Sequence, residues 1–300
     1  MSGLTVFTSN RLEILVEQLA RKIREPLSSP FDKDIIVVQS NGMARWVSME
    51  LARINNIFAN CEFPFPDTFL NYLCERLTPD VTHPTYFEPE VLTFSIMKYL
   101  PICNKRPGYE AVKNYLSDDN TQMKLLQLAE KIADVFDHYL VFRPEMIFEW
   151  ENGTIRGDED LAWQADLWRE IVTGSQQLHR AQIQRNLMEK IDSNEMVTQH
   201  LPDRISAFGI SHLPHFHLQI LERLSAHVQV NLFLMNPCKE YWGDLVTHRE
   251  AKHIKKVYQH KDVHPGDLHL EKGNSLIESM GILGRDFFDM VHGMNCELLE

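Results

Sequence analysis

The sequence predicts an α/β protein in which a parallel-sheet lobe is interrupted by an all-α insertion. Strand-like runs alternate with amphipathic helical patterns in residues 1–75 and again in residues 203–300. Between them, in residues 76–202, strand-like runs vanish and helical patterns follow one another. We therefore expect a discontinuous α/β lobe, 1–75 with 203–300, and an inserted helical subdomain, 76–202.

The segment 34–49 gives the clearest α/β signal. Residues 35–38 form a β-branched run, which predicts a strand buried on both faces. Residues 39–42 are turn residues, and from Met43 onward apolar positions recur with a helical period. Open α/β sheets place ligands at the carboxyl ends of their strands. Because this turn holds amides and hydroxyls but no catalytic set, we interpret it as a binding element.

The first strand is predicted at residues 4–8, and a helix that ends before Pro26 follows it. Asn10 and Glu13 have the spacing of a capping box at the start of this helix. A nucleotide-binding domain would have a glycine-rich loop with a Lys-Ser/Thr pair here. The chain has Thr-Ser-Asn-Arg at 8–11 instead, and no such motif elsewhere. We therefore do not expect an ATPase.

The aromatic segment 63–67 is predicted to be extended because it holds two prolines. Asp67 is expected to cap the next helix, which carries Phe69, Leu70 and Leu73. Two interpretations of Phe65 stay open: a packing residue, or an aromatic platform on which a nucleic-acid base stacks.

The insertion contains one polar constellation of interest. The helices are predicted at 91–100 (stopped by Pro101), 109–116, 122–141, from Pro144 onward, around 161–172, and at 180–191. Asp134, Asp137 and His138 share one face of the longest helix, and Arg143 follows its end. Three interpretations stay open: a metal or acid/base site, a solvated polar face, or a polar row that contacts DNA bases.

The α/β pattern returns with a strand at 204–210, a helix that carries 216–224, and an alternating strand at 228–234 with one face more buried. His212, His215 and His217 lie close in sequence, but no acidic or Cys partner completes a metal set. The Lys- and His-rich residues 248–264 predict an exposed helix. An apolar helical pattern at 283–291 comes just before Glu300, so we expect a fragment of a longer protein.

Composition excludes several classes of protein. The 300 residues are 44% hydrophobic and 24% charged, which is ordinary for a globular protein. No apolar run predicts a membrane span or a signal peptide, so we expect a cytoplasmic protein without membrane contact. The net charge of −12 argues against a general nucleic-acid coat protein but allows a local basic groove. Five scattered cysteines without a CxxC pair indicate reduced thiols rather than a zinc site.

Seven segments resemble the N-terminal part of the RecC family. They are FTSNRLEIL (7–15), IVVQSNGMARW (36–46), ANCEFPFPDTF (59–69), DVFDHYLVFRPE (134–145), AFGISHLP (207–214), NPCKEYWGD (236–244) and LGRDFFDM (283–290). They occur in the family's order over essentially the whole chain. RecC is the gamma subunit of exodeoxyribonuclease V, the RecBCD helicase–nuclease of double-strand break repair and homologous recombination.

The resemblance implies a superfamily 1 helicase domain that has lost its ATPase motifs, so the missing phosphate loop is expected. The chain itself would bind no cofactor, because ATP and Mg act in the other subunits of the complex. Its expected partners are the RecB and RecD subunits and forked duplex and single-stranded DNA. Its expected role is to split the duplex, channel the single strands and recognise the Chi sequence in the 3′-ended strand.

The resemblance also carries the Chi-reading role onto eleven residues. They are Gln39, Asn41, Arg45, Phe65, Asn71, Asp134, Val135, Asp137, His138, Arg143 and Arg180. Several differ from the family's best-known member, which has an amide at the position of Arg45 and an aromatic at that of Asn71. Arginine favours guanine over adenine, and loss of an aromatic removes stacking surface. We therefore hypothesise that a different octamer-like signal is read, or one signal less stringently.

Two rival functions remain. An active helicase or nuclease would need a phosphate loop or a carboxylate cluster that binds metal, and the sequence offers neither convincingly. A scaffold that only contacts other subunits would bind no DNA by itself.

Overall fold

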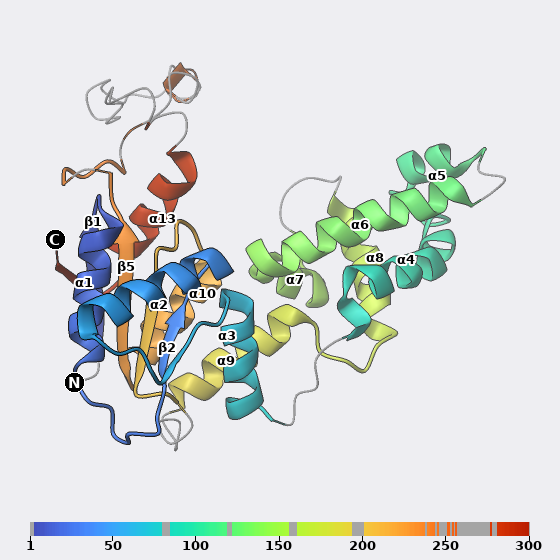
Figure 1. The fold of residues 1–300 in the computed structure, drawn as a ribbon. Coiled ribbons are helices and arrows are strands. Elements are labelled where there is room, and N and C mark those ends of the chain that lie inside the picture. Colours follow the sequence, from blue (N-terminus) through green and yellow to red (C-terminus); the bar gives the residue numbers. More distant parts are fainter. Residues whose placement is uncertain are drawn as a thin grey trace. The chain divides into compact units, whose positions relative to one another are not determined.

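The structure, a computed structural model, describes residues 3–79, 85–118, 122–155, 161–193, 201–237 and 281–299, together with 239–243, 245, 251, 252, 254, 256 and 277. The chain divides into two compact units, Met1–Arg76 with Asn194–Glu300 and Leu77–Ser193 (Figure 1). The first holds a parallel sheet with helices and the second is helical, so the predicted α/β class with a helical insertion is confirmed.

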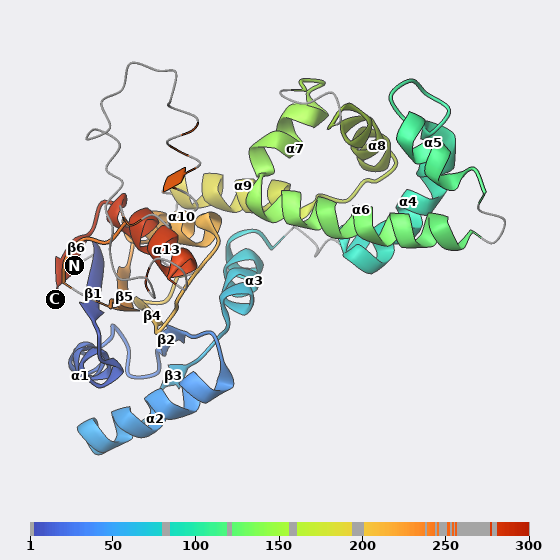
Figure 2. The same ribbon diagram turned by 90° about the horizontal axis from the view of Figure 1, so that it is seen from above.

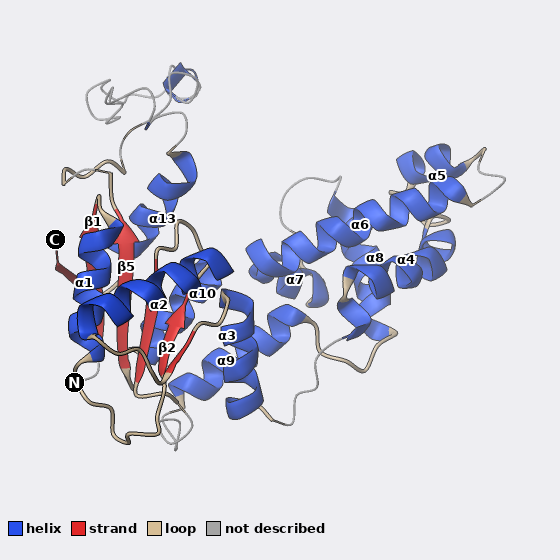
Figure 3. Cartoon of the chain, in the orientation of Figure 1, coloured by secondary structure: helices blue, strands red, loops and turns tan. Residues whose placement is uncertain are grey.

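The described part of the first unit contains a parallel sheet of six strands in the order β3-β2-β4-β5-β1-β6, drawn in red in Figure 3. The strands are β1 (Gly3–Ser9), β2 (Asp34–Val37), β3 (Cys61–Glu62), β4 (Arg204–Phe208), β5 (Gln229–Met235) and β6 (Glu297–Leu299). The helices are α1 (Leu12–Ile23), α2 (Asn41–Asn55), α3 (Pro66–Leu77), α10 (His215–Leu224) and α13 (Ile282–His292). Figure 2 shows α1 and α2 on one face of the sheet and α10 and α13 on the other.

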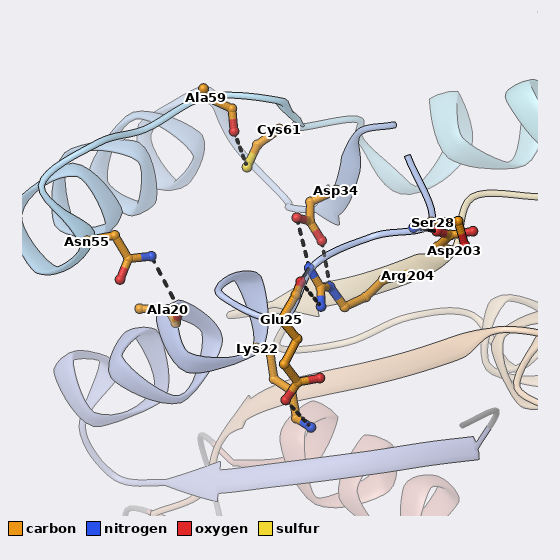
Figure 4. A network of polar contacts seen from close by, with 10 residues as sticks. All are labelled: Ala20, Lys22, Glu25, Ser28, Asp34, Asn55, Ala59, Cys61, Asp203 and Arg204. Carbon is orange, nitrogen blue, oxygen red and sulfur yellow. Dashed lines mark hydrogen bonds and ion pairs between the residues drawn. The ribbon is translucent and has the colours of Figure 1, made fainter. Parts of the chain in front are cut away.

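The sheet closes across the point where the helical unit is inserted. The chain leaves the lobe after α3 and returns just before β4, yet β4 pairs directly with β2, with Ile205 beside Ile35. A buried ion pair joins the amino ends of the two strands, as Figure 4 shows. Arg204 donates from Nε to Asp34 Oδ1 at 2.6 Å and from Nη2 to Oδ2 at 3.0 Å. Arg204 also donates to the carbonyl of Glu25, which follows the C-cap of α1.

The strand β5 is buried on both faces, so the predicted alternation with one face more buried is wrong. Residues 230–234 are all buried. The reason is that α1 contacts β5 on one side and α10 contacts it on the other. On the α1 side, Phe233 stacks on Phe7 with ring centroids 4.8 Å apart.

Three predicted helix ends differ from the structure. The capping box of Asn10 and Glu13 is wrong, because α1 begins at Leu12 after Arg11, which makes no side-chain cap. Asp67 does not cap α3, because the helix already begins at Pro66, a residue suited to a first helical position. Pro101 does not stop α4: it lies in the last turn, where a missing N–H removes a single hydrogen bond.

The helical unit packs around aromatic side chains. Its described elements are the 3-10 helix η1 (Thr85–Phe87) and the helices α4 (Pro89–Cys103), α5 (Glu110–Leu116), α6 (Met123–Phe142), α7 (Pro144–Glu151), α8 (Ala162–Thr173) and α9 (Arg180–Asp192). Phe136 on α6 contacts Trp150 and Trp168 edge-on, at 6.4 Å and 5.2 Å between centroids. The buried ring of His179 lies with Nε2 2.7 Å from Glu151 Oε1.

The helix predicted at 248–264 lies mainly outside the described residues, so it stays a prediction. None of the helices in the described ranges is long and apolar enough to cross a membrane.

Candidate nucleic-acid interface

Gln39 connects the carboxyl ends of two neighbouring strands. It follows β2, and its Nε2 donates a hydrogen bond of 2.8 Å to the carbonyl of His212 in the loop after β4. Its Oε1 accepts from the backbone N–H and the hydroxyl of Ser211, both at 3.3 Å. The side chain stays exposed. Gln39 therefore fixes the loop before α10 and retains part of its amide for another contact.

A glycine allows α2 to lie close to the end of β4. Gly209 has a φ of +63°, and a Cβ at this position would lie 3.0 Å from Met43 Cε. Both the backbone conformation and the close approach favour glycine. The first turn of α2 is therefore seated directly beside the loop that Gln39 holds.

The first turn of α2 presents polar groups to solvent. Ser40 caps the helix, because its Oγ accepts from the N–H of Met43 at 3.1 Å. Asn41 and Arg45 are exposed and, four residues apart, share one side of the helix, whereas Val47 and Leu51 are buried. The first turn has no acidic residue. The positive end of the helix dipole is therefore uncompensated, which favours an anion such as phosphate.

Two further predicted residues, Phe65 and Asn71, lie at or on helix α3, whose opposite side is buried. Phe65, just before the helix, is 39% exposed, and its carbonyl accepts from the N–H of Phe69 at 2.8 Å. Asn71 is exposed on the helix itself. Phe69 and Leu70 are buried on the other side, where they line a small apolar pocket with α10. Asp67 Oδ1 lies 3.4 Å from Nε2 of the buried His217.

The helix α6 has a buried face and an exposed face. The buried residues are Ala129, Ile132, Ala133, Phe136 and Leu140. Asp134 is exposed and lies 3.6 Å from Lys131 Nζ, and Val135 is 38% exposed. Asp137 is half-buried, and the exposed His138 has its ring 6.3 Å from that of Phe142. This face therefore alternates carboxylate, apolar and imidazole groups along about two turns.

Two arginines complete the predicted set. Arg143 is exposed at the junction of α6 and α7, with its guanidinium 5.8 Å from the ring centroid of Tyr139. Arg180 is the half-buried first residue of α9, and it follows the capping residue His179. Arg143 thus offers hydrogen-bond donors and a planar surface to a partner.

The predicted residues fall into two groups. Five are on the α/β unit: Gln39, Asn41, Arg45, Phe65 and Asn71. Six are on the helical unit: Asp134, Val135, Asp137, His138, Arg143 and Arg180. The sequence reading missed Lys131 and Phe142 beside them, although Phe142 lies four residues after His138. It also missed Ser211 as a partner of Gln39, because nothing local links residues 172 positions apart.

Two geometric features bear on the catalytic alternatives. Among the residues that the structure describes, no three His, Cys, Asp or Glu side chains lie close enough to hold a metal ion, and this includes Asp134, Asp137 and His138. Only two residues separate Ser9 at the end of β1 from Leu12 at the start of α1. A phosphate-binding loop is longer and glycine-rich, so this connection does not form one.

Known proteins resemble the chain along its whole length. The family described as "RecC, N-terminal domain" matches residues 4–299. The chain belongs to the RecC family. It is 35% identical to the RecBCD enzyme subunit RecC of Escherichia coli strain K12, over 95% of this chain and 28% of that protein. The corresponding subunit of Haemophilus influenzae strain Rd is 32% identical over 94% of this chain and 30% of that protein. The chain thus spans less than a third of these RecC proteins.

A more distant RecC protein also matches the chain nearly from end to end. The RecBCD enzyme subunit RecC of Mycolicibacterium smegmatis is 23% identical over 96% of this chain. The RecC likeness therefore covers both the α/β unit and the helical unit, which each carry part of the predicted residues.

Proposed function

We propose that the chain is the DNA-reading part of a subunit of a RecBCD helicase–nuclease, in the cytoplasm and in association with RecB and RecD. In this role it splits duplex DNA, channels the single strands and recognises a Chi sequence in the 3′-ended strand during recombinational repair. Membership of the RecC family is the observation that carries the proposal. The catalytic steps, with their ATP and Mg, belong to the other subunits.

The side chains on both units suit base reading. Asn41 and Arg45 offer an amide and a guanidinium, the groups that hydrogen-bond adenine and guanine edges. Phe65 and His138 offer exposed rings for stacking. Acidic groups on α6 accept hydrogen bonds from cytosine amino groups, so their charge is compatible with base contact. The open N-terminus of α2 favours a backbone phosphate.

Three measurements on the purified chain test this role. Single-stranded DNA binding is expected, with an affinity that falls as salt rises because phosphate contacts release counterions. ATP hydrolysis and divalent-dependent nicking are expected to be absent. Salt-independent or absent DNA binding would instead indicate a scaffold, and nucleotide turnover by the chain alone would indicate an active motor.

The recognised word is tested in the assembled complex. Competition among oligonucleotides that carry different Chi-like octamers should show a preference different from that of the Escherichia coli complex, or a weaker one. Asn71→Trp should strengthen binding by roughly 5- to 150-fold, because stacking on one base contributes ~1–3 kcal/mol. Glu17→Trp, on the exposed side of α1, is the matched control. Octamer preference and affinity unchanged by Asn71→Trp would contradict base reading by α3.

A further inference from the structure

The most exposed large apolar side chain in the described part of the chain is Phe31, in the connection between α1 and β2. Its exposed fraction is 88%. Water-exposed phenylalanine is unfavourable, and a single one is common on protein surfaces. Phe31 differs because its backbone is held at the tip of a defined turn.

The turn around Phe31 is closed by its own hydrogen bonds. The N–H of Asp32 donates to the carbonyl of Ser29 at 3.1 Å, which makes residues 29–32 a β-turn with Pro30 and Phe31 at its corners. The Asp32 carboxylate accepts from the N–H of Ser29 at 3.0 Å, and the Ser29 hydroxyl accepts from the N–H of Phe31 at 3.2 Å. Proline at the first corner restricts the backbone further.

The turn is also fixed to the sheet on both sides. On one side, the N–H of Ser28 donates to Asp203 Oδ2, just before β4. On the other side, the amide of Asn60 donates to the carbonyl of Pro30 at 2.8 Å, and the Asn60 carbonyl accepts from the N–H of Asp34. The contacts of Arg204 with Asp34 and with the Glu25 carbonyl hold the two ends of the connection that contains the turn (Figure 4). The backbone that carries the ring is therefore fixed, and only the side-chain rotamer of Phe31 remains to be ordered on binding.

The charges around the turn distinguish a protein partner from a nucleic acid. Asp32 is exposed within the turn, and the Asp203 carboxylate accepts a hydrogen bond from Ser28, just before the turn. The neighbouring cation Lys33 forms an ion pair with Glu62. Surfaces that stack on single-stranded DNA combine aromatic rings with a positive groove. This surface has carboxylates instead, so it repels phosphates and attracts a basic rim.

We propose that Phe31 is an anchor residue that inserts into an apolar pocket with a basic rim on another subunit of the helicase–nuclease. A rigid aromatic side chain that fills a pocket is the usual centre of such an interface. The acidic turn steers the encounter and excludes DNA from this surface. The identity of the partner subunit rests on the function proposed above.

The test compares variants of the protein in the assembled complex. Phe31→Ser should weaken association with the other subunits by about tenfold or more, because one buried aromatic side chain is lost. Its thermal unfolding should match that of the unaltered protein, because the ring touches little in the free chain. Phe31→Trp should retain association. Phe94→Ser removes a 68%-exposed ring on α4 and is the matched control, with no expected effect.

Failure of the proposed function and failure of the Phe31 anchor give different results. If the unaltered protein fails to assemble with the other subunits, the proposed function fails. If it assembles and Phe31→Ser assembles equally well, only the anchor is refuted. Photo-crosslinking from benzoylphenylalanine at position 31 should label a subunit polypeptide. Labelling of DNA alone, or a tenfold loss of DNA binding with assembly intact, would overturn the proposal in favour of a nucleic-acid surface.

Discussion

Replacing Arg204 by methionine should destabilise the α/β unit severely. The side chains of Arg204 and Asp34 are only 3% and 9% exposed, and two hydrogen bonds join them. Methionine keeps most of the packing of the arginine stem but leaves the carboxylate buried without its partner. Breaking a buried pair in this way costs about 3–5 kcal/mol. Because a domain is stable by only about 5–15 kcal/mol, this loss is a large fraction of the stability of the lobe.

Hydrogen exchange of the β2 and β4 amides measures this loss in the α/β unit alone. A loss of ~3–5 kcal/mol corresponds to exchange that is roughly 100- to several-thousand-fold faster, at 1.4 kcal/mol per factor of ten. The double variant Asp34→Leu/Arg204→Met should recover most of the stability, because an apolar pair replaces the ion pair. Lys33→Met is the control: its pair with Glu62 is about half exposed, so the effect should be ~0–1 kcal/mol.

Either of two results would refute the reasoning. The first is an Arg204→Met variant whose β2 and β4 amides exchange less than tenfold faster than in the unaltered chain. The second is a double variant as unstable as the sum of the two single losses. Both would mean that Asp34 finds water or another donor, and that the ion pair contributes little to closing the sheet across the insertion.

Three further predictions concern buried groups. Burial opposes ionisation of Glu151, but the hydrogen bond and charge of His179 and the bond from Trp168 outweigh it and hold its pKa below the usual range. The stability that this interaction contributes is present above the ordinary glutamate pKa and is lost as the pH falls through the lowered pKa. The free energy of unfolding, measured across the acid range, should therefore depend less on pH in Glu151→Gln than in the unaltered chain. Burial, with the charge of Asp34, raises the pKa of Cys61 to about 12. Mass spectrometry should show iodoacetamide alkylation of Cys61 at pH 8 roughly a thousand-fold slower than in the urea-unfolded chain. Asn231 is fully buried with both side-chain polar atoms unpartnered, so Asn231→Leu should raise the free energy of unfolding by ~1–3 kcal/mol, measured as a higher urea midpoint. An unchanged or lower midpoint would indicate that a buried water satisfies the amide.

The sequence predicted elements whose side-chain pattern is local. Residues 35–38 form a β-branched run, and α6 has an apolar stripe over twenty residues, so both elements were recognisable. The strands β3 and β6 have two and three residues, too few to show alternation. The burial of β5 on both faces follows from which helices pack on it, and that depends on the sheet order. Asn231 is polar in sequence, and this made the strand look half-exposed.

The sequence also predicted only part of the site, because it shows local side-chain patterns but not long-range contacts. Exposure of Asn41 and Arg45 follows from the helical period of α2, which places them away from Val47 and Leu51. Which long-range partners a polar residue has does not follow from any period. The contacts of Gln39 with Ser211 and His212 join residues more than 170 positions apart, across the whole helical insertion.

These long-range contacts change how the predicted reading residues should be understood. The strands β2 and β4 are joined at their amino ends by Asp34 and Arg204 and at their carboxyl ends by Gln39 and the loop before α10. The first turn of α2 follows Gln39 directly, so its orientation depends on the second contact. A substitution at Gln39 therefore has two effects at the same time. It removes the proposed contact of Gln39 with a DNA base, and it frees the first turn of α2, which carries Asn41 and Arg45. A loss of DNA binding in such a variant has two physical causes. Ser211→Ala removes the hydroxyl bond to Gln39 and keeps the two bonds to backbone groups, so it weakens the positioning effect alone while Gln39 stays available to DNA.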